Sequence, residues 1–109
     1  MGAIPQEVLN ITTEYINKLN QQIPVEKAIL FGSYAKGNYA KDSDVDLAVF
    51  SPAFENMTRV DGLTFLLMQA LDYKLDIQPQ PFTMNDYVEQ TGLVDEILKT
   101  GMEINVMTK

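Results

Sequence analysis

Two short stretches decide the fold of this chain: LFGSYAKG at residues 30–37 and SDVDLAVF at residues 43–50. In the first, Gly32 and Ser33 directly follow an apolar run that predicts a buried strand over 27–31. A turn at that point aims backbone N–H groups and a hydroxyl at an anion, and glycine allows a ligand to approach the backbone closely. The first stretch therefore predicts an anion-binding turn at the end of a strand.

The second stretch predicts another strand, over 44–50, with Asp44 and Asp46 on one face because alternate side chains of a strand share a face. Three apolar residues of this strand would face the core: Val45, Leu47 and Val49. Adjacent carboxylates repel each other unless a cation lies between them, and Mg²⁺ prefers such oxygen ligands together with substrate phosphates. The pair is a candidate metal site, and a solvated strand face is the plainer alternative.

The spacing of Gly32-Ser33 and Asp44-x-Asp46, with ten residues between them, resembles the signature of the nucleotidyltransferases related to DNA polymerase β. The longer pattern Gly-Ser-x-Ala-x-Gly…Ser-Asp-x-Asp-Leu is similar to that of the minimal nucleotidyltransferases, or MNT proteins, which are often the antitoxins of HEPN/MNT toxin–antitoxin pairs. The resemblance extends over nearly the whole chain. Many members carry arginine where this chain has Lys36, which keeps the charge but loses the planar fork of the guanidinium.

A third acidic residue, Asp76, stands between Leu75 and Ile77 in a predicted strand, where an unpartnered carboxylate would be costly to bury. In the resembling family, a third acid on the neighbouring strand helps to hold the catalytic metal and acts as a base toward the attacking hydroxyl. The resemblance therefore implies that Asp44, Asp46 and Asp76 are catalytic and bind two Mg²⁺ ions. The alternative is that Asp76 is an exposed residue near a strand end.

The same resemblance assigns the triphosphate of ATP to Gly32, Ser33 and Lys36. An acceptor hydroxyl would attack the α-phosphorus and pyrophosphate would leave, so that catalysis depends on positioning and on charge neutralisation. The plainer alternatives are that Ser33 is only the N-cap of a short helix, and that Lys36 and Lys41 are solvated surface residues.

The remaining pattern predicts an α+β fold, in which a small mixed β-sheet is flanked by helices in the order α-β-α-β-α-β-α, as one domain over residues 1–109. A third strand is expected over 73–78, ended by Pro79 and Pro81, and a last short strand over 102–107. Helices are expected over four ranges: 5–20, 34–40 with Gly37 as the residue that ends it, 59–72, and 83–100 with a break at Gly92. The helix over 59–72 is expected to bury one apolar stripe: Val60, Leu63, Leu66, Leu67 and Leu71.

The composition restricts the function. The net charge of −7, from eight basic and fifteen acidic residues, argues against a long nucleic-acid partner, because such partners are held largely by Lys and Arg. The lack of cysteine and histidine excludes disulfides, thiolate zinc sites and histidine catalysis. No apolar run approaches the roughly 20 residues of a membrane-spanning helix, and the first residues do not read as a secretory signal. We therefore expect a cytoplasmic protein that does not bind membranes.

The first functional hypothesis is a Mg²⁺-dependent adenylyltransferase that moves AMP from ATP to a tyrosine of a partner HEPN toxin and so acts as its antitoxin. Two alternatives stay open. One is an antitoxin that occludes the toxin while its metal site is idle. The other is a small-molecule nucleotidyltransferase that works with a second subunit. The presence of all three acids, Asp44, Asp46 and Asp76, favours the first hypothesis.

Overall fold

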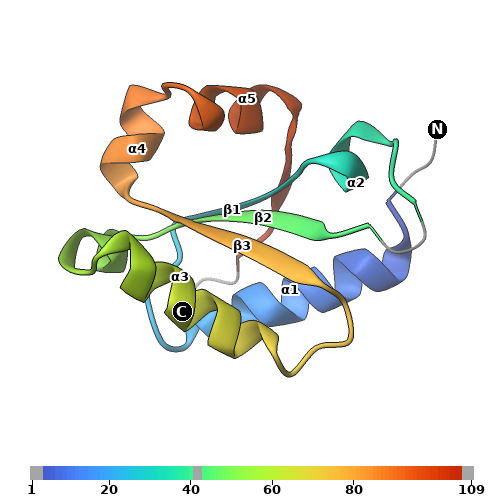
Figure 1. Cartoon of the computed structure of the whole chain (residues 1–109), viewed down its shortest axis with the longest axis horizontal. Coiled ribbons are helices and arrows are strands. Elements are labelled where there is room, and N and C mark those ends of the chain that lie inside the picture. Colours follow the sequence, from blue (N-terminus) through green and yellow to red (C-terminus); the bar gives the residue numbers. More distant parts are fainter. Residues whose placement is uncertain (1–3, 41–42, 107–109) are drawn as a thin grey trace.

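The computed structural model describes residues 4–40 and 43–106 (Figure 1). Its centre is a four-stranded sheet in the order β3-β2-β1-β4. β2 is antiparallel to β1 and parallel to β3, and β4 is antiparallel to β1. The strands are β1 (Lys27–Phe31), β2 (Val45–Phe50), β3 (Ile77–Phe82) and β4 (Met102–Ile104). The mixed sheet with flanking helices confirms the predicted α+β class.

Helices cover both faces of the sheet (Figure 1). One face carries α1 (Gln6–Asn20) and α3 (Arg59–Ala70). The other carries α4 (Met84–Glu89) and α5 (Leu93–Thr100). A single turn of helix, α2 (Ser33–Lys36), follows β1, and a 3₁₀ helix, η1 (Pro52–Asn56), precedes α3. No helix within the described ranges is long and apolar enough to cross a bilayer.

β2 supplies side chains to both faces. Val45, Leu47 and Val49 join the buried cluster under α1 and α3, as predicted. Ala48 and Phe50 point the opposite way and join a second cluster with α5. All five are fully buried. Asp46 alternates with the first set, and therefore shares the face of Ala48 and Phe50.

The third strand is displaced from its predicted position. β3 spans Ile77–Phe82 rather than 73–78, and it contains Pro79 and Pro81. The prediction was wrong because it took both prolines as strand terminators. β3 is an edge strand, where proline is tolerated when its missing N–H would face outward.

Hydrogen bonds show which way the residues of β3 face. The carbonyls of Asp76 and Phe82 accept from the backbone N–H groups of Val45 and Ser51, at 2.9 and 3.0 Å. The backbone polar groups of successive strand residues point to opposite sides, so even-numbered residues of β3 bond to β2. Pro79 and Pro81 are odd-numbered, so their backbone nitrogen atoms point to the open edge of the sheet, where no ladder hydrogen bond is lost.

Two helical predictions also need correction. α2 stops at Lys36, short of Ala40, because Gly37 adopts the left-handed conformation that closes the helix, which confirms Gly37 as the residue that ends it; its N-cap is Gly32 rather than Ser33. Of the stripe predicted for the helix over 59–72, Leu66 is fully buried, whereas three members are exposed: Val60, Leu67 and Leu71. The residues of α3 that pack inward are Gly62, Leu66 and Ala70.

Other boundaries agree with the sequence pattern. α1 begins one residue after Pro5 and buries Val8, Tyr15, Ile16 and Leu19. The Tyr15 hydroxyl donates to the Leu66 carbonyl at 2.8 Å and so joins α1 to α3. The helices after β3 are separated at Gly92, as predicted. Lys41 and Asp42 lie outside the described residues.

Candidate active site

The Gly-Ser turn and the paired aspartates meet at the end of β1. Phe31, the last residue of β1, is paired with Asp46 of β2, so the following residue, Gly32, lies against the Asp46 carboxylate. Gly32 has φ +75° and ψ −148°, a conformation that residues with a Cβ rarely adopt. A Cβ at this position would overlap Asp46 Oδ2. Glycine is therefore required twice here, for the turn and for contact with the carboxylate.

This contact leads to a stability prediction for Gly32→Ala. The added methyl group brings both backbone strain and a clash with Asp46, and we expect the free energy of unfolding to fall by about 3 kcal/mol. Gly92→Ala is the matched control, because Gly92 has φ +57° but no atom within 4 Å of the added Cβ. It should cost about 1 kcal/mol. Chemical denaturation measures both, and equal losses would contradict the predicted contact.

The two aspartates of the second stretch act on each other electrostatically. Asp44 is exposed and Asp46 is half-buried. Burial raises the pKa of the Asp46 carboxyl, and the negative charge of Asp44 raises this pKa further. The two carboxylates therefore form a site in which negative charge is costly and a cation is favoured.

Asp76 lies at the same end of the β2–β3 pair. It immediately precedes β3 and is exposed. Val45 of β2 is paired with Ile77 of β3. The residues that precede them, Asp44 and Asp76, are therefore neighbours at the start of these two strands. The Asp76 carboxylate accepts a hydrogen bond from Gln78 Nε2 at 2.9 Å. Within residues 4–40 and 43–106, no three acidic, histidine or cysteine side chains are close enough together to hold one metal ion.

Gln78 belongs to this site and was missed by the sequence analysis. It is paired with Asp46 in the β2–β3 register, and its side chain contacts Asp76. It therefore lies next to both Asp46 and Asp76. The predicted strand ended at Gln78, so Gln78 was not considered as a neighbour of Asp46. A strand predicted to begin at Ile77 would have placed the two residues on neighbouring strands.

The structure places the predicted nucleotide ligands Ser33 and Lys36 in different surroundings. Ser33 is the first residue of α2, and no side-chain hydrogen bond caps this helix. Lys36 Nζ is 3.2 Å from Glu96 Oε2 of α5, so its charge is directed at that helix. Both side chains of this ion pair are largely exposed, and such pairs contribute little stability, so the contact is easily exchanged for another anion. Lys41 lies outside the described residues.

The donor chemistry fits a hard divalent cation. Asp44 and Asp46 are neighbouring carboxylates, and Mg²⁺ is commonly held by one or two carboxylates together with phosphate oxygens of a substrate. The turn at Gly32 lies directly against Asp46, and the absence of a side chain there lets a ligand come close to the backbone. The arrangement therefore offers adjoining ligands for a metal-bound polyphosphate, with carboxylates for the metal and the backbone of the turn for the phosphates.

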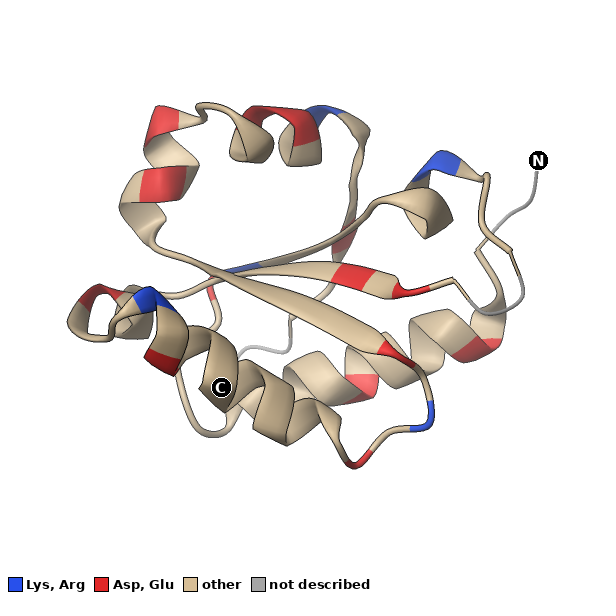
Figure 2. Ribbon diagram, in the orientation of Figure 1, with Lys and Arg blue, Asp and Glu red and all other residues tan. Residues whose placement is uncertain are grey.

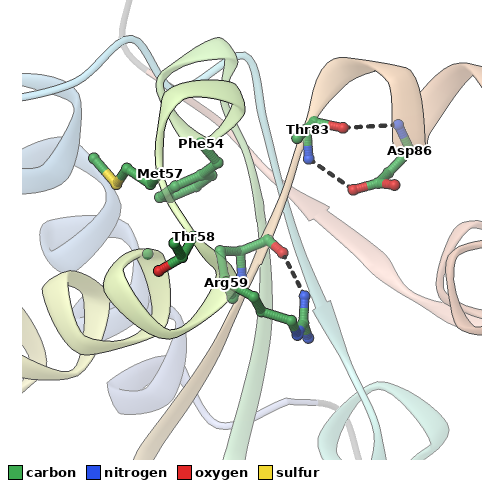
Figure 3. Close-up of a pocket in the computed structure, with 8 residues that line it drawn as sticks. Phe54, Met57, Thr58, Arg59, Thr83 and Asp86 are labelled. Atoms are coloured by element: carbon green, nitrogen blue, oxygen red, sulfur yellow. Dashed lines mark hydrogen bonds between the residues drawn. The ribbon is translucent and has the colours of Figure 1, made fainter.

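A separate cavity of about 160 Å³ opens at the opposite end of β3, between η1, α3 and α4 (Figure 3). Its polar groups already serve the fold: Arg59 donates to the Pro81 carbonyl at 3.1 Å, and Thr83 and Asp86 form a reciprocal cap of α4. The cavity is smaller than the roughly 300–1,000 Å³ of typical small-molecule sites. We therefore assign it a structural role.

Comparisons with known proteins show which proteins this chain resembles. A family model described as a nucleotidyltransferase domain matches residues 13–106. The candidate protein adenylyltransferase MJ0141 of Methanocaldococcus jannaschii is 25% identical over 100 residues, which cover 90% of this chain and 99% of the relative.

Two solved structures share the fold. The crystal structure of a candidate nucleotidyltransferase from Sulfolobus solfataricus has a TM-score of 0.69 at 17% identity, and the match covers 89% of this chain and 78% of that chain. A crystal structure of a toxin–antitoxin with AMP-PNP has a TM-score of 0.53 at 25% identity, and the match covers 88% of this chain and 74% of that chain.

Proposed function

Because this chain belongs to the nucleotidyltransferase domain family and is a nucleotidyltransferase, we propose that it transfers AMP from ATP to a hydroxyl group of a partner protein. We further propose that the partner is a HEPN toxin, that the acceptor is a tyrosine, and that the modification silences the toxin in the cytoplasm. The relative from M. jannaschii supports a protein acceptor, and the toxin–antitoxin structure with AMP-PNP supports both a toxin partner and an adenine nucleotide.

One observation carries the proposal. The carboxylate of Asp46, next to that of Asp44, lies directly against the Gly32 turn. This contact brings the candidate cation ligands and the candidate triphosphate-binding backbone to one point. Neither a helix cap alone nor a solvated strand face needs such an approach.

In the proposed reaction, Asp44 and Asp46 would hold Mg²⁺, which would neutralise phosphate charge and polarise the α-phosphate. Gly32 and Ser33 orient the triphosphate, and Lys36 exchanges Glu96 for a phosphate oxygen. The acceptor oxygen bonds to the α-phosphorus, the bond between this phosphorus and the bridging oxygen breaks, and pyrophosphate leaves. Asp76 takes the hydroxyl proton.

The experiment combines the purified chain, ATP, Mg²⁺ and the candidate toxin encoded by the neighbouring gene, and it reads the intact mass of the toxin. Each transfer should add about 329 Da, the mass of an adenylyl group. α,β-Methylene-ATP should add nothing, because its α–β bridge cannot break, whereas AMP-PNP should still donate AMP. A chelator should abolish transfer, and calorimetry should show that it also weakens ATP binding.

Other masses or outcomes would contradict the proposal. A gain of about 80 Da would indicate phosphoryl transfer instead. A toxin that is silenced without any mass change would indicate occlusion. A toxin that remains active and unmodified would exclude both mechanisms.

A further inference from the structure

The outward side of α3 is unusually apolar. Val60 is 72% exposed, Met68 is 61% exposed, and Leu71, the residue that caps the helix, is 74% exposed. Leu67, at 39%, completes this set. The helix therefore has two apolar sides, because Leu66 and its inward neighbours are buried against the sheet and α1.

These exposed residues form one surface. Positions 60, 64, 67, 68 and 71 follow the helical spacing i, i+4, i+7, i+8 and i+11, which places their side chains along one stripe. The fifth member, Thr64, is uncharged. We call this stripe the outer face of α3. In Figure 2 most of the length of α3 carries no charged residue.

Four large apolar side chains in one stripe expose an apolar area on the order of a few hundred Å², the size at which patches on soluble proteins often mark interaction sites. An exposed apolar helix face of this spacing is also what a protein groove accepts in helix recognition. Single exposed apolar residues are common and need no explanation, but five consecutive uncharged positions of one stripe do.

We propose that the outer face of α3 docks the acceptor protein, through an apolar strip of that protein bordered by Lys and Arg. This inference rests on the proposed function, since it takes the same partner, and it adds where that partner binds. The charge of the chain supports a basic partner. The net charge is −7, and two exposed acids lie along one flank of the stripe: Asp61, and Asp72, which is paired with Lys18.

A second copy of this chain fits the face less well. Each copy carries a net charge of −7, so association is opposed by long-range repulsion. In an antiparallel two-fold pairing of α3 with itself, the same flank of each helix would meet, and Asp61 of one copy would approach Asp72 of the other. A partner with basic borders would instead attract both the net negative charge of the chain and the acids at Asp61 and Asp72.

The position of α3 suits this role. Asp76, at the candidate active site, is only five positions after Leu71, which lies at the end of the outer face. Five extended residues span at most about 18 Å, which is less than the width of a small protein domain. Asp44 and Asp46 lie on the other face of the sheet from α3, so a protein docked on α3 must extend a loop or a tail past the start of β3 to reach them.

The test measures binding of the full chain to the purified toxin by calorimetry, with Val60→Lys and Met68→Lys as variants. Each should weaken Kd by 10- to 100-fold, because an apolar contact is lost and a like charge is introduced against a basic border. Met68→Glu should be less harmful than Met68→Lys, since its charge is opposite to that of the border. Both positions are exposed, so the melting temperature of all three variants should be unchanged.

Val88→Lys is the matched control. Val88 is the same residue type as Val60 and is 73% exposed, but it lies on α4, on the other side of the sheet. This variant should bind the toxin with the wild-type Kd. Sedimentation of the chain alone should give a monomer.

Three results would overturn the inference: no binding of the toxin to the wild type, wild-type affinity in Val60→Lys and Met68→Lys, or a wild-type dimer that becomes monomeric in those variants. Failure of the proposed function is separately visible. If the wild type binds the toxin and only the α3 variants lose binding, yet ATP and Mg²⁺ add no mass, the docking surface stands and the transfer reaction is wrong.

Discussion

Asp46→Asn is expected to abolish AMP transfer and at the same time to raise the stability of the metal-free protein. The carboxylate is the half-buried member of the pair and lies against the Gly32 turn, so its loss removes a proposed cation ligand at the proposed phosphate site. Groups that stabilise the charge of a transition state are typically worth 10²- to 10³-fold in rate. We expect a fall of at least that size in the mass-spectrometric assay.

The stability gain follows from the direction of the pKa shift. Burial and the charge of Asp44 raise the folded-state pKa of Asp46 above its unfolded value, so the charged form is disfavoured in the folded protein. Below the unfolded pKa, near 4, both states are protonated and the penalty is absent. As the pH rises through the folded pKa the penalty develops in full, and wild-type stability falls relative to Asp46→Asn.

Thermal unfolding in chelator, from pH 3 to pH 7, measures this difference. The melting temperature of Asp46→Asn should exceed that of the wild type at pH 7, and the gap should close at pH 3. Asp95→Asn is the control, because Asp95 is an acid of α5 whose carboxylate is paired with Lys99, 3.1 Å away. An Asp46→Asn protein that melts well below the wild type at pH 7 would show that this carboxylate stabilises the fold.

Asp76→Asn is expected to reduce transfer by about 10²-fold while ATP binding stays nearly unchanged. Asp44 and Asp46 remain available for the metal that accompanies the triphosphate, whereas the proposed base toward the acceptor is lost. The asparagine still accepts a hydrogen bond from Gln78, so local structure is preserved. Calorimetry measures ATP binding, and single-turnover mass spectrometry measures transfer.

Asp72→Asn provides the comparison for the third acid. Asp72 lies in the same segment between α3 and β3, where it forms an ion pair with Lys18. The Asp72→Asn variant should transfer AMP to a small tyrosine peptide, which does not need the docking surface on α3, at the wild-type rate. If Asp76→Asn modifies the toxin at the wild-type rate, Asp76 is not the base. If it loses ATP binding as well, the residue belongs to the triphosphate site.

The parts of the site that are close in sequence were predictable. Gly32 and Asp46 meet because β1 and β2 are neighbouring antiparallel strands joined by a short segment, and period-two alternation puts Asp44 and Asp46 on one face. The contact between Lys36 and Glu96 was not predictable, because it joins residues sixty positions apart through the packing of α5.

The errors in the fold have a common cause. A sequence pattern records that residues are apolar or rigid, but it does not record which neighbour they meet. α3 has two apolar sides, and only tertiary packing decides that Leu66 faces inward and Leu67 outward. In the same way, Pro79 and Pro81 end a central strand but fit an edge strand, and the position of β3 in the sheet is a property of the assembled fold.

The prolines of β3 have a consequence for how this protein resists aggregation. A strand that joins the open edge needs free N–H donors there, and three residues of β3 face that edge. Pro79 and Pro81 have no N–H, and the N–H of Ile77 donates to the Leu75 carbonyl at 3.0 Å. Arg59 also occupies the Pro81 carbonyl. The edge of the sheet beside the aspartates is therefore closed to strand addition, so edge-to-edge polymerisation cannot start there.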